Sequence, residues 1–113
     1  MQHQIINTMI VTFEKEYLKE LYECGKTNDK KHRYQPDIVK RFQERIKLLV
    51  RATDTKELLL YNSLHYEELK GDKHGICSIR VNKKYRIEFS VEETLTKPII
   101  TICNIIELSN HYQ

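Results

Sequence analysis

The spacing of apolar residues changes along the chain, and each change marks a predicted element. The consecutive residues Met9 to Phe13 are mostly apolar or β-branched, which predicts the beginning of a strand. Between Glu14 and Cys24 apolar residues recur at helical spacing, and Gly25 follows where a helix C-cap would lie. The N-terminal part of the domain is therefore predicted to be a strand followed by a helix.

A second helix is predicted from Pro36, because proline is favoured in the first turn of a helix. Its apolar residues form one stripe: Ile38, Val39, Phe42, Ile46, Leu49 and Val50. Its other face is charged and typical of a solvated surface, so we assign no function to Lys40, Arg41, Glu44, Arg45, Lys47 and Arg51. The run Thr53-Asp54-Thr55 can end this helix and cap a short turn through Leu58 to Leu60.

Residues 62–75 are predicted to form a loop, and three strands are predicted after it, at Ile76–Val81, Tyr85–Val91 and Ile99–Leu108. The last strand is nearly all apolar, so we expect it inside the sheet with both faces covered. This order predicts an α/β (α+β) domain in which two helices pack on one face of a small, mainly antiparallel sheet.

The register of the predicted hairpin around Asn82 follows from the alternation of side chains along a strand. A three-residue turn over 82–84 collects the apolar residues on one face, with Val81 opposite Tyr85, Ile79 opposite Ile87 and Cys77 opposite Phe89. A two-residue turn would scatter them over both faces. The three-residue turn also places Arg80 directly opposite Arg86, on the same face as Ser78 and Glu88.

Facing arginines repel each other, and two interpretations of this pair stay open. In one, both side chains extend into water or pair with Glu88, which costs little because exposed charges are screened. In the other, Arg80 and Arg86 form a fork for an anion, because guanidinium donors match phosphate oxygens in bidentate geometry. An RNA backbone would supply such an anion.

The composition of the chain, 113 residues with 40% hydrophobic and 31% charged, is that of one folded domain. We expect this domain over residues 9–113, with residues 1–8 as an extension or Met9 as the native start. No segment approaches the roughly 20 apolar residues of a membrane span, so we expect a cytoplasmic protein without a membrane partner. The widely spaced Cys24, Cys77 and Cys103 predict buried thiols, and we expect no metal and no cofactor.

The net charge of +3 is modest, but the basic residues gather in two segments, 26–33 and 70–86. Such clusters permit a phosphate-rich partner without requiring one. A DNA-binding regulator is disfavoured, because the second helix lacks the turn and partner helix of a helix-turn-helix.

The segment from Leu64 to Gly75, with residues 78–81 and 85–89, resembles the HigB-type plasmid maintenance killer toxins of the RelE-like superfamily. The shared pattern consists of a histidine, a Lys-Gly-Asp, an Arg-Val and an Arg-hydrophobic pair, here His65, Lys70 to Asp72, Arg80 with Val81, and Arg86 with Ile87. The similarity runs from Met9 to the C-terminus, and the family's small curved sheet with helices on one face agrees with the predicted order. The chain departs from the family where Cys77 and Asn110 stand, since these positions often hold an aromatic and an acidic residue.

This resemblance implies the toxin of a type II toxin-antitoxin system, a metal-independent endoribonuclease that inhibits translation by cutting mRNA in the ribosomal A site. It implies a HigA-type helix-turn-helix antitoxin as partner, through which alone the toxin would meet DNA. The family's catalytic positions match His65, Lys70, Arg80, Arg86 and His111. The RNA-binding residues that we predict are Lys73, His74, Lys83, Lys84 and Tyr112.

These residue types suit RNA cleavage, because the attack of a 2′-OH on the adjacent phosphate needs a base, an acid and cations. His65 is the predicted proton-transfer group, His111 a second acid or base, and Tyr112 a side chain that can stack on a base. The alternative is a non-catalytic module of the same fold that binds RNA, the ribosome or only the antitoxin. The catalytic prediction is preferred because binding an RNA backbone alone would not need the proton-transfer residues.

Overall fold

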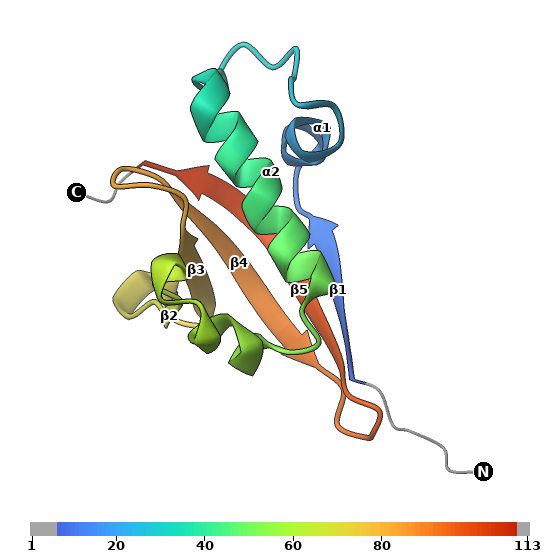
Figure 1. Cartoon of the computed structure of the whole chain (residues 1–113). Coiled ribbons are helices and arrows are strands. Elements are labelled where there is room, and N and C mark those ends of the chain that lie inside the picture. The colour runs from blue at the N-terminus through green and yellow to red at the C-terminus, as the bar shows by residue number, and fades with distance from the viewer. Residues whose placement is uncertain (1–6, 111–113) are drawn as a thin grey trace.

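The structure is a computed structural model that describes residues 7–110. Within them, a five-stranded sheet of order β1-β5-β4-β3-β2 is covered on one face by two α-helices (Figure 1). The helices are α1 (Glu16–Cys24) and α2 (Pro36–Arg51), and the strands are β1 (Thr8–Phe13), β2 (Glu67–Glu68), β3 (Ile76–Arg80), β4 (Arg86–Glu93) and β5 (Ile100–Ser109). Three short 3-10 helices complete this part of the chain: η1 (Thr55–Leu60), η2 (Asn62–Leu64) and η3 (Gly71–Lys73). The predicted fold class is confirmed.

Strand β5 lies inside the sheet, as predicted, parallel to β1 and antiparallel to β4. The expectation that both of its faces are covered is wrong. Cys103 and Ile105 are fully buried in the core, whereas Ile102 on the other face is 37% exposed. The reason is that both α-helices pack on the same side of the sheet, so the apolar composition of β5 exceeds what burial on one face requires.

The register of the β3–β4 hairpin is the predicted one. Cys77 pairs with Phe89, Ile79 with Ile87, and Arg80 with Arg86. The side chain of Asn82 closes the turn, since its Oδ1 accepts the backbone N–H groups of Lys84 at 2.9 Å and Tyr85 at 2.8 Å. Lys83 and Lys84 are exposed at its tip.

A bulge in β5 changes which of its residues face the core. Glu88 of β4 pairs with Glu107, but Phe89 pairs with Ile105, so Ile106 is an extra residue in β5. Before the bulge the buried residues are Cys103 and Ile105, and after it the buried apolar residue is Leu108. The bulge thereby keeps β5 packed on the helices along its length.

The core joins the inner faces of both α-helices to the helix-facing side of the sheet. Its fully buried residues include Leu18, Phe42, Ile46, Leu49, Ile79, Ile87, Phe89 and Ile105. One prediction of buried residues is wrong: Cys24, at the last position of α1, is exposed. Val50 belongs to the predicted apolar stripe of α2 but is 47% exposed, next to the fully buried Leu49. Cys77 and Cys103 are buried as predicted.

The segment predicted as a loop, residues 62–75, contains η2, η3 and the two-residue strand β2. Strand β2 was not predicted; it pairs antiparallel with β3, with Glu67 opposite Ser78. This pairing brings the segment against the sheet and fixes its path. In the described part of the chain no helix is long and apolar enough to cross a membrane.

Candidate active site

A basic groove lies between α2, the His65 segment and the β3–β4 turn. Its lining residues are Asp37, Arg41, Arg45, Ser63, His65, Arg80, Val81, Asn82, Lys83 and Lys84. Five of these described residues are Arg or Lys, and one, Asp37, is acidic. A surface with this balance of charge attracts a polyanion.

His65 and Arg80 meet in this groove. Nη1 of Arg80 lies 3.4 Å from Nε2 of His65. A guanidinium group can only donate, so Nε2 is the acceptor and Nδ1 carries the proton of the neutral imidazole. Arg80 is held in turn, because its Nε donates to the backbone oxygen of Asn82 at 3.1 Å. The ring of His65 is exposed, so its accepting nitrogen lies within reach of a ligand in the groove.

The backbone of His65 has a left-handed conformation, with φ 44° and ψ 50°. Within residues 7–110 it is the one non-glycine residue with positive φ. Such a conformation costs on the order of 1 kcal/mol and persists where surrounding contacts impose it. The contacts at His65 therefore identify the residues that orient its ring.

Arg86 of β4 makes one of the contacts that hold His65. It is 8% exposed, and its Nη2 donates to the backbone oxygen of His65. Its Nε donates to Oγ of Ser78 at 2.8 Å, and Nη2 lies 3.6 Å from Oε1 of Glu67. Both interpretations of the facing arginines treated them as equivalent, which is wrong: Arg80 lines the groove, whereas Arg86 is buried beneath it and bound to protein groups.

A second charged contact attaches the far end of the segment to β4. Nζ of Lys73 lies 2.8 and 3.0 Å from the two carboxylate oxygens of Glu88, which is 2% exposed. Arg86 and Glu88 are two residues apart and share one face of β4. Strand β4 therefore holds the segment at both ends, through Arg86 at His65 and through Glu88 at Lys73.

The other predicted site residues are not all in one place. Lys83 and Lys84 line the basic groove. Lys70 and His74 are exposed but do not line it, and His74 borders a separate hollow beside Tyr66. The predicted residues His111 and Tyr112 lie outside the described part of the chain.

Two arginines of the groove were assigned to the solvated face of α2 by sequence reasoning. Arg41 and Arg45 are four residues apart, and so is Asp37 from Arg41, which places all three on one side of the helix. Nε of Arg45 donates to the backbone oxygen of Arg80 at 3.0 Å, and burial lowers the pKa of its guanidinium from the ordinary value. The four-residue spacing could have indicated that these residues share one side of the helix and bind together. A solvated helix face with ion pairs has the same spacing, so the sequence did not distinguish the two.

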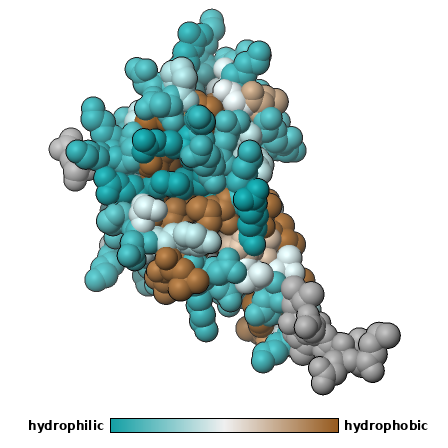
Figure 2. All heavy atoms as spheres, in the orientation of Figure 1, coloured by the Kyte–Doolittle hydropathy of each residue, from teal (hydrophilic) through white to brown (hydrophobic). Residues whose placement is uncertain are grey.

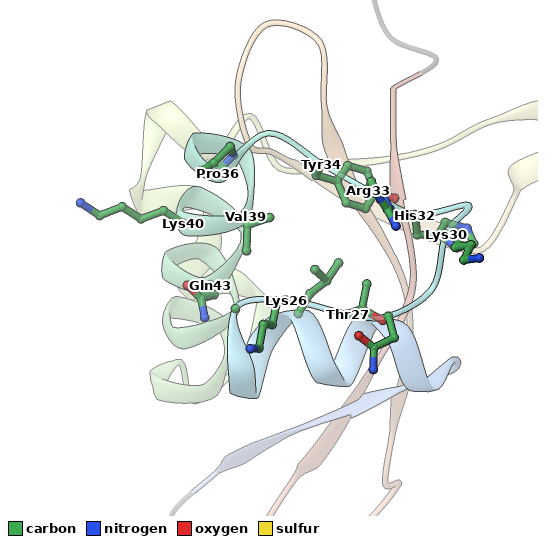
Figure 3. A pocket seen from close by; sticks show the side chains of 13 residues that line it. Lys26, Thr27, Lys30, His32, Arg33, Tyr34, Pro36, Val39, Lys40 and Gln43 are labelled. Atoms are coloured by element: carbon green, nitrogen blue, oxygen red, sulfur yellow. The ribbon is translucent and has the colours of Figure 1, made fainter.

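A different basic hollow lies between α1, α2 and the segment that joins them, where Lys26, Lys30 and Arg33 stand around it (Figure 3). Its histidine, His32, stacks on Tyr17 with ring centroids 3.7 Å apart and an interplanar angle of 9°. The contact of His65 with Arg80 therefore assigns the candidate active site to the basic groove. Within residues 7–110 no group of three His, Cys, Asp or Glu side chains is placed to hold a metal ion.

The fold is that of RelE-like toxins. A YoeB/ParE toxin from Agrobacterium tumefaciens superposes with a TM-score of 0.57 at 17% identity, covering 92% of this chain and 100% of that one. A chain of the YoeB-YefM complex from Staphylococcus aureus superposes with a TM-score of 0.53 at 19% identity, covering 92% and 98%.

Sequence comparison narrows this class to one family. The family model described as the RelE-like toxin of type II toxin-antitoxin system HigB matches residues 11–99. Toxin HigB-1 from Vibrio cholerae serotype O1 is 33% identical over 82 residues, which cover 72% of this chain and 82% of that toxin. The chain belongs to the HigB family of type II toxins.

Proposed function

We propose that this toxin is a metal-independent endoribonuclease that inhibits translation by cutting mRNA in the ribosomal A site. The observation that carries the proposal is the contact between Nε2 of His65 and the guanidinium of Arg80 in a groove with four further cationic residues. A proton-transfer group beside a phosphate-binding group is what RNA transesterification requires.

In the proposed reaction, Nε2 of His65 takes the proton of a ribose 2′-OH. The 2′-oxygen then forms a bond to the adjacent phosphorus, and the bond from phosphorus to the 5′-oxygen breaks. The products are a 2′,3′-cyclic phosphate and a 5′-hydroxyl, whose proton comes from a general acid. Arg80 stabilises the charge that develops on the phosphate, and His111 is the acid that the family resemblance implies.

The remaining basic residues have different roles in this proposal. Arg41, Arg45, Lys83 and Lys84 bind the RNA backbone along the groove. Arg86 is a positioning residue, because it contacts the backbone of His65 from a buried position. Lys70, which lies outside the groove lining, adds positive charge near the RNA.

The partner that we propose is a HigA-type helix-turn-helix antitoxin, which would hold the toxin inactive in the cytoplasm and provide any contact with DNA. Membership in a type II toxin family supports an antitoxin partner. A fold relative from Staphylococcus aureus is described as a YoeB-YefM complex, a toxin bound to an antitoxin.

The test is a cell-free translation reaction on a defined message, with the new RNA 5′ ends mapped. The purified toxin, His65→Ala and the control His74→Ala are each added, and naked RNA is treated in parallel. Codon-phased cuts that need ribosomes, disappear with His65→Ala and persist with His74→Ala are the expected result. Cuts in naked RNA would refute the ribosome dependence, and intact message throughout would favour a non-catalytic module that binds RNA or only its antitoxin.

A further inference from the structure

A second, smaller hollow shares His65 with the basic groove and combines apolar and polar lining residues. Its lining residues are Leu58, Leu59, Tyr61, Asn62, His65 and Tyr66. It encloses about 170 Å³, less than a quarter of the about 730 Å³ of the basic groove. The hollow therefore has room for a small group rather than for a chain segment.

The rim of this hollow exposes large apolar side chains. Leu59 is 63% exposed and Tyr61 is 44% exposed. Figure 2 shows hydrophobic atoms gathered on the surface over the segment between α2 and β2, within a mostly hydrophilic face. Adjacent exposed apolar residues next to a charged groove are typical of a ligand-contact surface.

The wall of the hollow is held in place by the sheet. The ring of Tyr66 stacks on Phe89, with centroids 6.2 Å apart and an interplanar angle of 17°, and its hydroxyl donates to Sγ of Cys77 at 3.4 Å. Leu58 is fully buried, and Oδ1 of Asp54 caps the 3-10 helix that carries it. A preformed wall costs little ordering when a ligand binds.

His65 lines both the basic groove and the smaller hollow. A single-stranded RNA presents a charged phosphate on one side of each ribose and, on the other, a planar base with apolar faces and hydrogen-bonding edges. We propose that the hollow binds the base of the nucleotide whose 2′-OH faces His65. This inference rests on the proposed function, because it takes the occupant of the basic groove to be RNA.

The side chains at the rim have different roles in binding the base. Tyr61 and Leu59 contact the face of the base, an interaction that accepts every base because each has a π-face. The amide of Asn62 donates and accepts at once, so it can distinguish the hydrogen-bonding edges of different bases. Tyr61 therefore contributes affinity for any base, and Asn62 contributes preference.

Binding is measured with a short, fluorescently labelled RNA carrying 2′-O-methyl riboses, which cannot be cut, and with the same oligomer lacking its bases. Tyr61→Ala is compared with Leu60→Ala, because Leu60 is a neighbouring large hydrophobic residue that is more exposed but does not line the hollow. Tyr61→Ala weakens binding of the intact oligomer about tenfold and leaves the abasic oligomer unaffected. Leu60→Ala binds both oligomers as the wild-type toxin does.

The inference is overturned if the wild-type toxin does not distinguish the two oligomers, or if Tyr61→Ala and Leu60→Ala behave alike. A mapped cleavage reaction gives the second measurement, in which Asn62→Ala changes the nucleotide preference at the cut. Cleavage whose preference is unchanged in Asn62→Ala and Tyr61→Ala overturns the base subsite and leaves the nuclease proposal standing. Binding that depends on the bases, by a toxin that cuts no RNA, overturns the nuclease proposal and leaves the base subsite standing.

Discussion

Arg86 in strand β4 donates a hydrogen bond to the backbone oxygen of His65, twenty-one residues earlier in the chain. The carbonyl that it holds belongs to the one non-glycine residue with positive φ among residues 7–110. The same guanidinium is bound to Ser78 of the adjacent strand. The sheet therefore holds the backbone of His65 through a buried cation, in addition to the local bond from the His65 N–H to the backbone oxygen of Asn62.

Replacing Arg86 and Arg80 separates positioning from phosphate binding. Arg86→Met removes a buried, hydrogen-bonded charge and lowers the free energy of unfolding by about 2–4 kcal/mol. Arg80→Met changes that free energy by about 0.5 kcal/mol or less and lowers the cleavage rate on the order of 100-fold. Denaturant unfolding and cleavage kinetics on the same samples provide the measurement. Equal destabilisation by both variants would contradict the division of roles.

The contact of Lys73 with Glu88 predicts that Lys73 stabilises the fold. Lys73→Met removes the ion pair to the carboxylate of Glu88, which is 2% exposed, and lowers the free energy of unfolding by about 1–2 kcal/mol. This expected loss is smaller than for a fully buried ion pair, because the Lys73 side chain is 42% exposed. The matched control is Lys70→Met, at an exposed position three residues earlier. It changes the free energy of unfolding by about 0.5 kcal/mol or less. Indistinguishable unfolding midpoints for the two variants would show that the ion pair contributes nothing.

The salt dependence of RNA binding distinguishes the two sides of the charged face of α2. Arg41 lines the basic groove, whereas the equally exposed Lys47 does not. Arg41→Ala therefore weakens binding and reduces the slope of log K against log salt by about 0.7, the value for one phosphate contact with a single strand. Lys47→Ala leaves the slope unchanged. Equal slopes in a salt titration of both variants would place the RNA elsewhere.

The three cysteines differ in reactivity. Cys24 is exposed at the end of α1, whereas burial raises the pKa of the Cys77 thiol and raises that of Cys103 to about 12. Because the thiolate is the reactive form, iodoacetamide at pH 8 adds once to the native protein and three times in denaturant. Intact mass measures both numbers. Cys24→Ser should give no native adduct, and a persisting adduct would mean that a buried thiol is accessible.

Buried phenols predict a loss of stability in alkali. Burial raises the pKa of Tyr34 from the ordinary 10.0, and the Tyr34 hydroxyl donates to the backbone oxygen of Leu108 at 3.3 Å. A raised pKa means that the folded protein holds this proton more tightly than the unfolded chain. The stabilisation is therefore complete below pH 10 and is lost as the pH rises above it. Urea unfolding between pH 8 and 11 should show a shallower decline for Tyr34→Phe; an identical decline would contradict this assignment.

The order of the elements and the β3–β4 register could be predicted from the sequence because both depend on neighbours along the chain. Side chains alternate between the faces of a strand, so the apolar residues of the hairpin are compatible with one register. Placing Arg80 opposite Arg86 followed from that register alone. The family pattern that contains His65 is likewise a matter of sequence order.

The tertiary structure decided how these residues are used. Nothing local distinguishes Arg80 from Arg86, but Arg86 is buried and contacts His65 and Glu67 of the 62–75 segment. The same long-range packing directs Arg41 and Arg45 toward Arg80 and engages Lys73 with Glu88. The sequence by itself determined the fold class and the hairpin register. The division between buried, positioning cations and groove-lining cations depended on contacts between distant segments, whose free energy is set by packing and not by local periodicity.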